Sequence, residues 1–279
     1  YDHLDIEYLK RTHITWTNCP GCNANSVGQY IHSCLLLLEK EKGYDLSKTT
    51  VGLVGVGHVG HAVIEAIRPL GVQILLNDPP QKEALRKAGK PHEFFLKMEE
   101  LQEKCDIISF HTPLITKGPY PTFHLANKIF FNALKKQPII INTSRGAVVD
   151  NTDVLQALKD GIIRDAIIDT WENEPNINQE LLNLIYIGTP HIAGYSADGK
   201  ANATRMALTA LCNHFHLPVT FQIRVPQLPE EELPESNLTE TERALVLYNP
   251  HTDSLKLKSH PTMFEELRGN YPLRREFIE

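Results

Sequence analysis

The chain has 279 residues, of which 42% are hydrophobic, so it is long enough for a large core and for about two domains. Its formal net charge of −6 is spread along the sequence and forms no basic stripe of the kind that nucleic-acid binding needs. The aliphatic runs are far shorter than a membrane span, and the acidic, polar start is unlike a secretory signal. Together with five unevenly spaced cysteines, these features favour a soluble, reduced, cytoplasmic protein without membrane or nucleic-acid partners.

The first segment that raises a chemical question is "ITWTNCPGCNANSVGQYIHSCLLLL" at 14–38, where Cys19 and Cys22 lie between an expected strand and an expected helix. A C-x-x-C in this position can be the reactive pair of a thiol–disulfide oxidoreductase, or half of a zinc site. No second C-x-x-C follows, and the other three cysteines stand alone in apolar stretches. We interpret the pair as structural, and a thiol or zinc protein remains an alternative.

Between residues 50 and 190, short β-rich runs alternate with stretches of helix length. The predicted strands are 50–56, 72–77, 105–111, 138–142, 165–169 and 184–188, and the helices expected between them include 59–68, 94–103 and 151–159. Continuous apolar strands that alternate with helices are typical of a parallel sheet covered on both faces. The pattern therefore predicts an α/β, doubly wound, Rossmann-like domain.

The most specific local signal is "GVGHVG", with Gly55, Gly57 and Gly60. It follows a predicted strand and opens a predicted helix, which is the setting in which backbone amides hold a pyrophosphate. Asp78 ends the next strand, where a carboxylate can accept hydrogen bonds from a ribose 2′-hydroxyl and would repel a 2′-phosphate. The motif therefore predicts a dinucleotide cofactor, and NAD rather than NADP.

Polar residues also follow the later strands. They are Thr112, the run Thr143-Ser144-Arg145, the run from Asp169 to Glu174, and His191. Each has an ordinary structural interpretation: Arg145 can be a solvated loop arginine, Glu174 a helix cap and His191 a core histidine. Ligands of doubly wound sheets bind beyond the carboxyl ends of the strands. These polar residues all follow strands and are therefore expected at one edge of the sheet, where together they indicate an active site.

After residue 213 the character of the sequence changes. The stretch "HLPVTFQIRVPQLPEEELPES" at 216–236 has four prolines and an acidic run, and is interpreted as a linker. The tail that follows predicts a small α+β element, with its β part at 244–248 and 254–258 and a helix at 262–270.

Several motifs resemble the D-2-hydroxyacid dehydrogenase family: "INTSRGAVVD", "DTWENEP" and "TPHIAGYSADGK", in that order after "GVGHVG". Three further stretches, "HTPLITKGPYPTFHLAN", "PGCNANSV" and "FEELRGNYPLRREF", resemble the branch of the family that oxidises 4-phospho-D-erythronate with NAD in vitamin B6 biosynthesis. The resemblance covers nearly the whole chain. It also interprets "PGCNA" as the turn by which the chain enters the nucleotide domain, with only Cys22 matching the family pattern.

The resemblance implies a role for individual residues. Arg145 would bind the substrate carboxylate, and its guanidinium fork suits that group. His191 would accept the hydroxyl proton, and Glu174, rather than Glu172, would orient its ring. Asp169 would contact the nicotinamide carboxamide and Tyr195 the substrate. The remaining cofactor contacts would come from Thr112, Thr143 and Gly194, and from the backbone of His58 and Val59.

The resemblance further implies a domain order. Residues 1–22 would be the remnant of a flavodoxin-like substrate domain, 23–193 the NAD-binding domain and 194–216 a crossover helix, while 217–279 would form a linker and a dimerisation domain. We expect a homodimer whose substrate is a small phosphorylated 2-hydroxy acid. The chain lacks an initiating Met, so we expect it to begin inside a longer protein whose preceding segment binds the phosphate. Gln29 departs from the family, where many members have Glu.

Two alternatives stay open beside this interpretation. The protein could act on another 2-hydroxy acid, such as 3-phosphoglycerate or glycerate. It could also be an NAD-sensing interaction protein of the same fold, which needs the cofactor but no turnover.

Overall fold

The computed structural model of the chain describes residues 4–229, 234–235 and 237–276. Some residues of the two expected end regions, 1–22 and 217–279, lie outside the described residues. They are 1–3, 230–233, 236 and 277–279. Among the described residues, every helix is too short or too polar to cross a bilayer.

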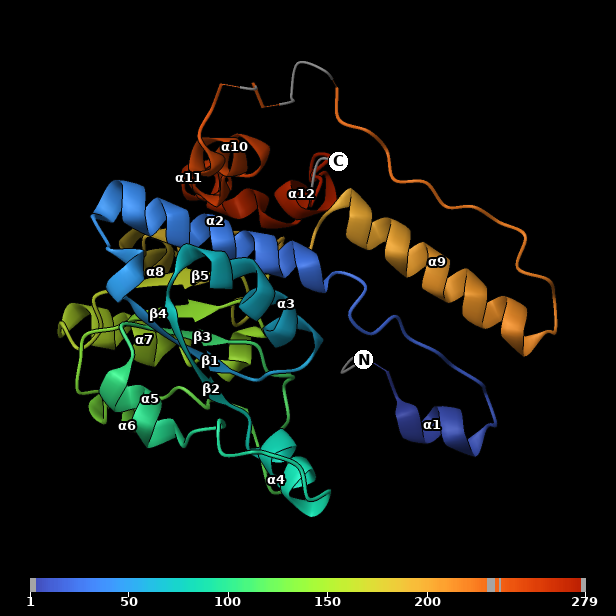
Figure 1. Cartoon of the computed structure of the whole chain (residues 1–279), viewed down its shortest axis with the longest axis horizontal. Helices are drawn as coiled ribbons and strands as arrows, with labels where there is room; N and C mark the ends of the chain where they lie inside the picture. Colours follow the sequence, from blue (N-terminus) through green and yellow to red (C-terminus); the bar gives the residue numbers. More distant parts are fainter. Residues whose placement is uncertain (1–3, 230–233, 236, 277–279) are drawn as a thin grey trace.

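A parallel sheet forms the centre of the molecule (Figure 1). Within the described residues its six strands lie in the order β2-β1-β3-β4-β5-β6, which confirms the doubly wound fold. The strands are β1 (Thr50–Val54), β2 (Gln73–Asn77), β3 (Ile107–Phe110), β4 (Ile139–Asn142), β5 (Asp165–Ile168) and β6 (Ile187–Gly188). Because all the pairings are parallel, the carboxyl ends of the strands share one edge.

Helices cover both faces of the sheet, and each face has its own cluster of buried apolar side chains. One face is covered by α2 (Ala24–Lys42) and α3 (His58–Ile67), and the other by α5 (Met98–Lys104), α6 (Lys128–Asn132), α7 (Asn151–Lys159) and α8 (Gln179–Leu184). Helix α4 (Pro79–Lys87) follows β2, and short 3₁₀ turns occur at Leu46–Lys48, Arg68–Leu70, Gly146–Val148 and Pro261–Met263. Buried apolar strands with helices on both sides explain the continuous hydrophobic runs of the sequence.

One predicted helix begins later than the sequence indicated. The expected helix at 94–103 is α5, which starts only at Met98. Phe95 instead pairs with Leu76 in an isolated parallel bridge. The helix begins where Glu100 accepts a hydrogen bond from the backbone N–H of Lys97, at 3.0 Å. This bond from the Lys97 amide to the Glu100 carboxylate, rather than the apolar pattern, determines the boundary.

Two helices lie apart from the sheet. Helix α9 (Ala197–His214) extends away from it, and α1 (Ile6–Arg11) lies off the sheet on the same side (Figure 1). The buried residues of α9 are Ala197, Gly199 and Ala201, all at its first turns, and α1 has none. Both helices therefore contribute little to the core of the described chain.

The C-terminal part is helical, and the predicted α+β element is wrong in its β part. Residues 244–248 and 254–258 fall largely in α10 (Glu240–Leu247) and α11 (Pro250–Ser259), and the helix expected at 262–270 is α12 (Phe264–Gly269). Thr239 and Glu242 form a capping box at the start of α10, and Asn249 caps α11 ahead of Pro250. These local caps specify helices where the Leu- and Val-rich runs alone suggested strands.

The positions of Leu255 and Leu257 offer a direct test of this correction. In a strand the two side chains would share a face, whereas on α11 Leu257 is fully buried and Leu255 is 55% exposed. We expect Leu257→Ala to lower the free energy of unfolding by about 2–5 kcal/mol, and Leu255→Ala to change it by about 0.5 kcal/mol or less. Chemical denaturation of both variants measures this. Equal losses would support the strand.

Candidate functional site

The turn between β1 and α3 has the form of a phosphate-binding site. A Cβ on Gly60 would lie 2.3 Å from the carbonyl oxygen of Gly55, so only glycine allows the helix to approach the turn this closely. Gly57 precedes the helix, and apart from its chain neighbours no described residue has an atom within 4 Å of the place where its Cβ would be. Within the described part of the chain no side chain caps α3, so the amides of its first turn, at His58 and Val59, remain available to an anion.

Asp78 lies beside this turn at the end of β2. Its Oδ2 accepts a hydrogen bond from the backbone N–H of Val56 at 2.8 Å, and its Oδ1 accepts one from the N–H of Gln81 at 2.9 Å. The second bond caps α4. Nε2 of Gln81 donates a further hydrogen bond to Oδ2 of Asp78, at 3.1 Å. A carboxylate has about four acceptor positions, so the half-buried Asp78 keeps capacity for one more donor, such as a ribose hydroxyl.

A cavity of about 480 Å³ continues from the turn along the strand ends. It is lined by Val59, His111, Thr112, Pro113, Leu114, Ile115, Thr143, Ser144 and Arg145. The buried hydroxyl of Thr112 has no hydrogen-bond partner among the residues that the structure describes, and the hydroxyl of Thr143 lies 3.2 Å from Nδ1 of His111. Burial lowers the pKa of His111 to about 3, so this ring is neutral. An orphaned hydroxyl in a largely apolar cavity fits a cofactor with polar groups, as NAD has.

Arg145 lies between this cavity and a second one of about 410 Å³. The second cavity is lined by Leu114, Phe123, Arg145, Gly146, Ala147, Trp171, Glu172, Asn173, Glu174 and His191. Gly146 allows this arrangement, because a Cβ there would lie 1.9 Å from the carbonyl oxygen of Trp171. The guanidinium of Arg145 donates to the carbonyl of Ser144 at 2.8 Å, among its contacts. The predicted Arg145, Glu174 and His191 thus share one cavity.

His191 and Glu174 form a direct pair. Nδ1 of His191 lies 2.8 Å from Oε2 of Glu174, and the other carboxylate oxygen accepts from the backbone N–H of Trp171 at 2.8 Å. The carboxylate is therefore held on both sides, and the second ring nitrogen, Nε2, is the one left for a proton transfer. Glu172 makes different contacts: its carboxylate lies 2.7 Å from Nε2 of His124 and accepts from the N–H of Asn151. Glu174, rather than Glu172, is thus the glutamate beside His191, and its catalytic role stays a prediction.

Asp169 is buried under the turn that carries His191. It is 1% exposed, and it accepts hydrogen bonds from the Thr189 hydroxyl at 2.6 Å and from the N–H groups of Ile192 at 2.8 Å and Ala193 at 3.0 Å. Burial raises the pKa of this carboxyl, while these donors act in the opposite direction. His191 has a φ of 56°, a left-handed backbone that costs about 1–3 kcal/mol for a residue with a side chain. Asp169 stabilises this turn, and its contact with a nicotinamide stays a prediction.

The two residues that follow the turn face different neighbours. A Cβ on Gly194 would lie 2.3 Å from Nδ2 of Asn23, so a larger residue here would displace the Asn23 side chain, and the contact of Gly194 with the cofactor stays a prediction. Tyr195 lies between two cations, with Nζ of Lys200 at 5.3 Å and the guanidinium of Arg268 at 5.9 Å from its ring centre. It lines a separate cavity of about 380 Å³ and is not among the residues that line the cavity of His191. Its contact with the substrate stays a prediction.

The thiols of the C-x-x-C pair have ordinary structural contacts. Sγ of Cys19 lies 3.4 Å from the carbonyl oxygen of Ala203, to which it donates. Burial, followed by the neighbouring Cys19, raises the pKa of Cys22, which disfavours the thiolate that redox or zinc chemistry needs. Nowhere in the described part of the chain do three potential metal ligands come together.

Sequence reasoning missed several residues that build the site. Trp171 holds Glu174 through its backbone N–H, and its indole donates to the carbonyl of Thr189 at 2.9 Å. It stands inside the "DTWENEP" motif, which could have suggested it. Thr189 bonds Asp169, and Arg274 donates to the carbonyls of Ile192 and Ala193. Arg274 stands in the stretch "FEELRGNYPLRREF" that carries part of the resemblance, but nothing in that stretch indicates that its side chain reaches the turn of His191.

Comparison with known proteins defines the class. The family model for "D-isomer specific 2-hydroxyacid dehydrogenase, NAD binding domain" matches residues 35–193. The chain belongs to this family, and it carries an NAD-binding domain.

The relatives narrow this class. The chain is 51% identical over 276 residues to the erythronate-4-phosphate dehydrogenase of Bacteroides fragilis, covering 99% of this chain and 77% of the relative. It is 38% identical to the enzyme of the same name from Escherichia coli O157:H7, over 99% of this chain and 74% of the relative. A crystal structure of D-lactate dehydrogenase from Aquifex aeolicus, complexed with NAD and lactic acid, has a TM-score of 0.65 and 24% identity, covering 77% of this chain and 74% of that one. That likeness shows the fold.

The position of Asp78 predicts the choice of cofactor. We expect the protein to bind NAD more tightly than NADP, and Asp78→Ser to narrow the difference by about 1–3 kcal/mol, because a charged hydrogen bond and a repulsion are lost. Serine can still cap α4. Titration of both cofactors measures the change, with Asn178→Ser, at the cap of α8, as the control that should leave the ratio unchanged. Equal binding of NAD and NADP to the unmodified protein would contradict the assignment.

Proposed function

We propose that this protein oxidises 4-phospho-D-erythronate at C2 with NAD, as a step of vitamin B6 biosynthesis. Its relatives at 51% and 38% identity are named for this activity. The observation that carries the chemistry is the pairing of His191 with Glu174 at 2.8 Å, in a cavity that Arg145 also lines. A base, its orienting carboxylate and a guanidinium are the groups that oxidation of a 2-hydroxy acid requires.

The side chains would divide the work as follows. Val59, Thr112 and Thr143 would hold NAD, which when bound supplies the hydride acceptor. Arg145 would bind the substrate carboxylate and orient C2, since a guanidinium matches a carboxylate in shape and charge. His191 would take the hydroxyl proton at Nε2 while the C–H bond breaks and the carbonyl forms.

Glu174 would act through Nδ1 of His191. Its carboxylate selects the tautomer in which Nδ1 carries the hydrogen and Nε2 is free to accept one. Once Nε2 is protonated, the same carboxylate stabilises the imidazolium across the 2.8 Å contact. Glu174 can do this because the N–H of Trp171 holds its other oxygen.

The finer organisation is also proposed. Residues 1–22 would belong to a substrate domain, 23–193 to the NAD-binding domain, 194–216 to the crossover helix, and 217–279 to the linker and dimerisation domain of a cytoplasmic homodimer. In support, α1 has no buried residue, and α9 buries residues only at its first turns. Helices so sparsely packed need a further partner.

The role of His191 can be tested by substitution. We expect His191→Asn to lower kcat by roughly two or more orders of magnitude, because the proton acceptor is lost, while the Kd for NAD stays nearly unchanged. Steady-state kinetics and NAD titration measure the two quantities. His92→Asn, at a histidine remote from both cavities, serves as the control with normal turnover. Turnover at the normal rate in His191→Asn would remove this residue from the mechanism.

The substrate can be tested with the full-length protein and the 279-residue chain in parallel. We expect the full-length protein to oxidise 4-phospho-D-erythronate in preference to 3-phosphoglycerate and glycerate. The chain alone should bind NAD yet turn the substrate over poorly, because anchoring at both carboxylate and phosphate is needed to place C2.

Three outcomes of this comparison would change the proposal. Preference for 3-phosphoglycerate would transfer the assignment to that substrate. Full activity of the 279-residue chain would show that its own residues bind the phosphate. NAD binding by the full-length protein with no turnover of any 2-hydroxy acid would favour a sensor.

A further inference from the structure

The turn at 190–194 needs support from outside its own segment. His191 adopts a left-handed backbone, and such conformations persist only where the surroundings determine them. Asp169 supplies that support on one side, through the N–H groups of Ile192 and Ala193. The carbonyl groups of the same two residues point elsewhere and require donors of their own if they are buried.

Those donors come from Arg274, near the end of the described chain. Its guanidinium donates through Nη2 to the carbonyl of Ala193 at 2.7 Å and through Nη1 to that of Ile192 at 3.4 Å. Arg274 is 3% exposed. The turn is thus held between a buried carboxylate, which accepts from its amides, and a buried guanidinium, which donates to its carbonyls.

The guanidinium is itself held in place. Nη2 of Arg274 also donates to the carbonyl of Ser26 on α2 at 3.1 Å, and the group lies 4.1 Å from the ring centre of Tyr248. The carbonyl of Arg274 accepts from the N–H of Ala197, the first residue of α9, at 2.8 Å. A buried cation with this many fixed partners has little freedom, so it can set the position of the turn.

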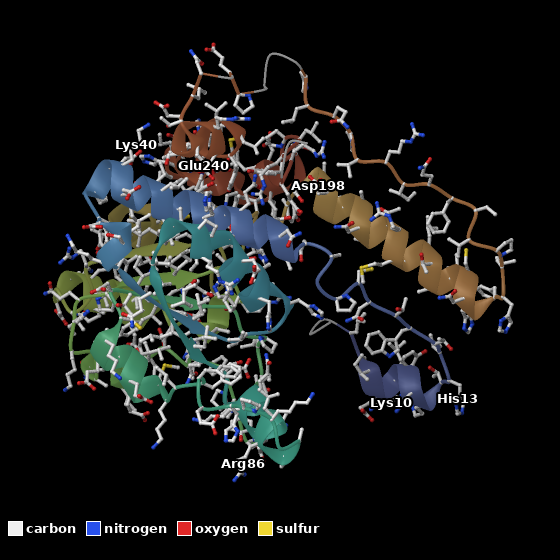
Figure 2. The ribbon with its side chains drawn as sticks, viewed as in Figure 1. Lys10, His13, Lys40, Arg86, Asp198 and Glu240 are labelled. Atoms are coloured by element: carbon white, nitrogen blue, oxygen red, sulfur yellow. The ribbon has the colours of Figure 1, made fainter. Side chains whose placement is uncertain are left out.

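The residues beside Arg274 attach the same segment to the chain. Nε of Arg275 and the N–H of Glu276 both donate to Oδ2 of Asp198, at 3.0 and 2.9 Å. Figure 2 shows Asp198 at the start of α9, next to the C-terminal helices. The amide of Gln29 donates to the carbonyl of Arg275 at 2.8 Å, which an ionised glutamate could not do. The contact offers a physical reason for glutamine at position 29, where many members of the family have glutamate: the amide can donate to this carbonyl.

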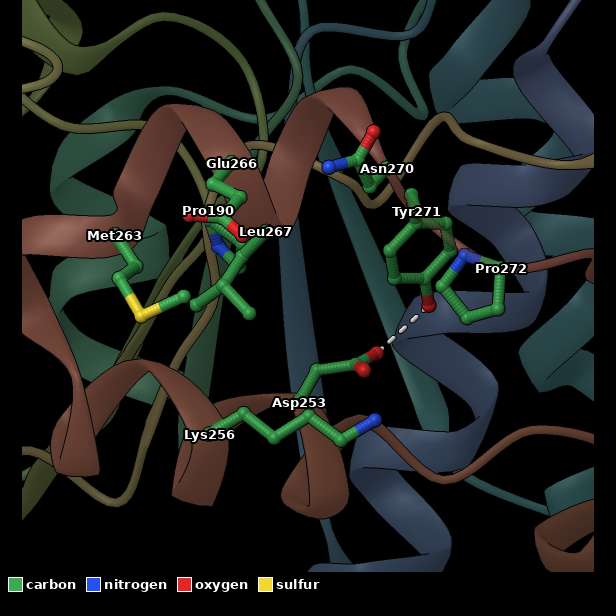
Figure 3. Close-up of a pocket in the computed structure, with 9 residues that line it drawn as sticks. All are labelled: Pro190, Asp253, Lys256, Met263, Glu266, Leu267, Asn270, Tyr271 and Pro272. Carbon is green, nitrogen blue, oxygen red and sulfur yellow. Dashed lines mark hydrogen bonds between the residues drawn. The ribbon is translucent and has the colours of Figure 1, made fainter.

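The helices that carry this segment pack behind the turn. Figure 3 shows Pro190, which precedes His191, beside residues of α11 and α12. Tyr271, three residues before Arg274 in the chain, attaches this segment to α11, because its hydroxyl donates to the carboxylate of Asp253 at 2.7 Å. The cavity between these residues measures only about 180 Å³, so the helices stand close to the turn.

We propose that Arg274 is a positioning residue for His191, and that the C-terminal helices therefore belong to the apparatus of the oxidation rather than only to assembly. The inference rests on the proposed function, in which His191 is the base. Arg274 does not touch the reacting atoms; it acts by fixing the carbonyl groups of Ile192 and Ala193.

The test compares Arg274→Met and Arg274→Lys with Lys258→Met in the full-length protein. Lys258 is the matched control, because it too donates from the C-terminal part of the chain, in α11, to backbone carbonyls, those of Ile185 and Tyr186, but outside the turn. kcat is expressed per NAD-binding site, so that unfolded protein does not count. We expect a fall of about 10- to 100-fold in Arg274→Met, a smaller fall in Arg274→Lys, and an NAD affinity within about threefold of normal.

A second measurement needs no substrate. Hydrogen exchange of the peptide that spans residues 189–196 should be faster in Arg274→Met and unchanged in Lys258→Met. Normal kcat per site in both Arg274 variants, or an equal fall in Lys258→Met, would overturn the proposal. If the unmodified protein oxidises none of the 2-hydroxy acids, the proposed function fails, and hydrogen exchange still decides whether Arg274 holds the turn. If Arg274→Met does not fold, Arg274→Lys provides both readouts.

Discussion

The hydrogen bonds of the buried Asp169 carboxylate are the interactions on which the candidate catalytic edge depends, that is, the edge of the sheet with Arg145, Glu174 and His191. Asp169 directly follows β5 and accepts hydrogen bonds from Thr189 and from the N–H groups of Ile192 and Ala193. Thr189 in turn lies 2.9 Å from the hydroxyl of Tyr30, which links this group to α2. Because burial makes an unsatisfied carboxylate very costly, these donors must stay in place. The sheet and α2 therefore position His191. Glu174 pairs with His191, and the cavity that both residues line adjoins the expected cofactor cavity at Arg145.

Much of this edge could be predicted from the sequence, because the information is local. The apolar runs are continuous, as buried parallel strands require, and helix α7 occupies the range expected for it. Parallel strands bring their carboxyl ends to one edge, so Arg145, Glu174 and His191 could be grouped although they are far apart in sequence. The glycine turn could be predicted as a phosphate-binding turn from its motif, because a position with no room for a Cβ, such as Gly60, requires glycine in the sequence itself.

The remainder depends on contacts that no local pattern records. Arg274 reaches the turn of His191 from the far end of the chain, and its role follows only from the docking of the C-terminal helices. Two of those helices, α10 and α11, stand where the apolar runs at 244–248 and 254–258 suggest strands, because short apolar runs carry less information than the caps at Thr239 and Asn249. Tyr195 shows a different limit. The motif indicates the residue, but its surroundings could not be predicted, because its cationic neighbours Lys200 and Arg268 come from α9 and α12.

The central claim is that this catalytic edge moves a hydride from C2 of a 2-hydroxy acid to NAD. Incubation of the full-length protein with NAD and 4-phospho-D-erythronate deuterated at C2 tests it most directly, with mass spectrometry of the cofactor after the reaction. We expect the deuterium to appear in the reduced nicotinamide, in equal amount to the 2-oxo acid formed. Formation of the 2-oxo acid without deuterium in the cofactor, or no reduction of NAD at all, would contradict it.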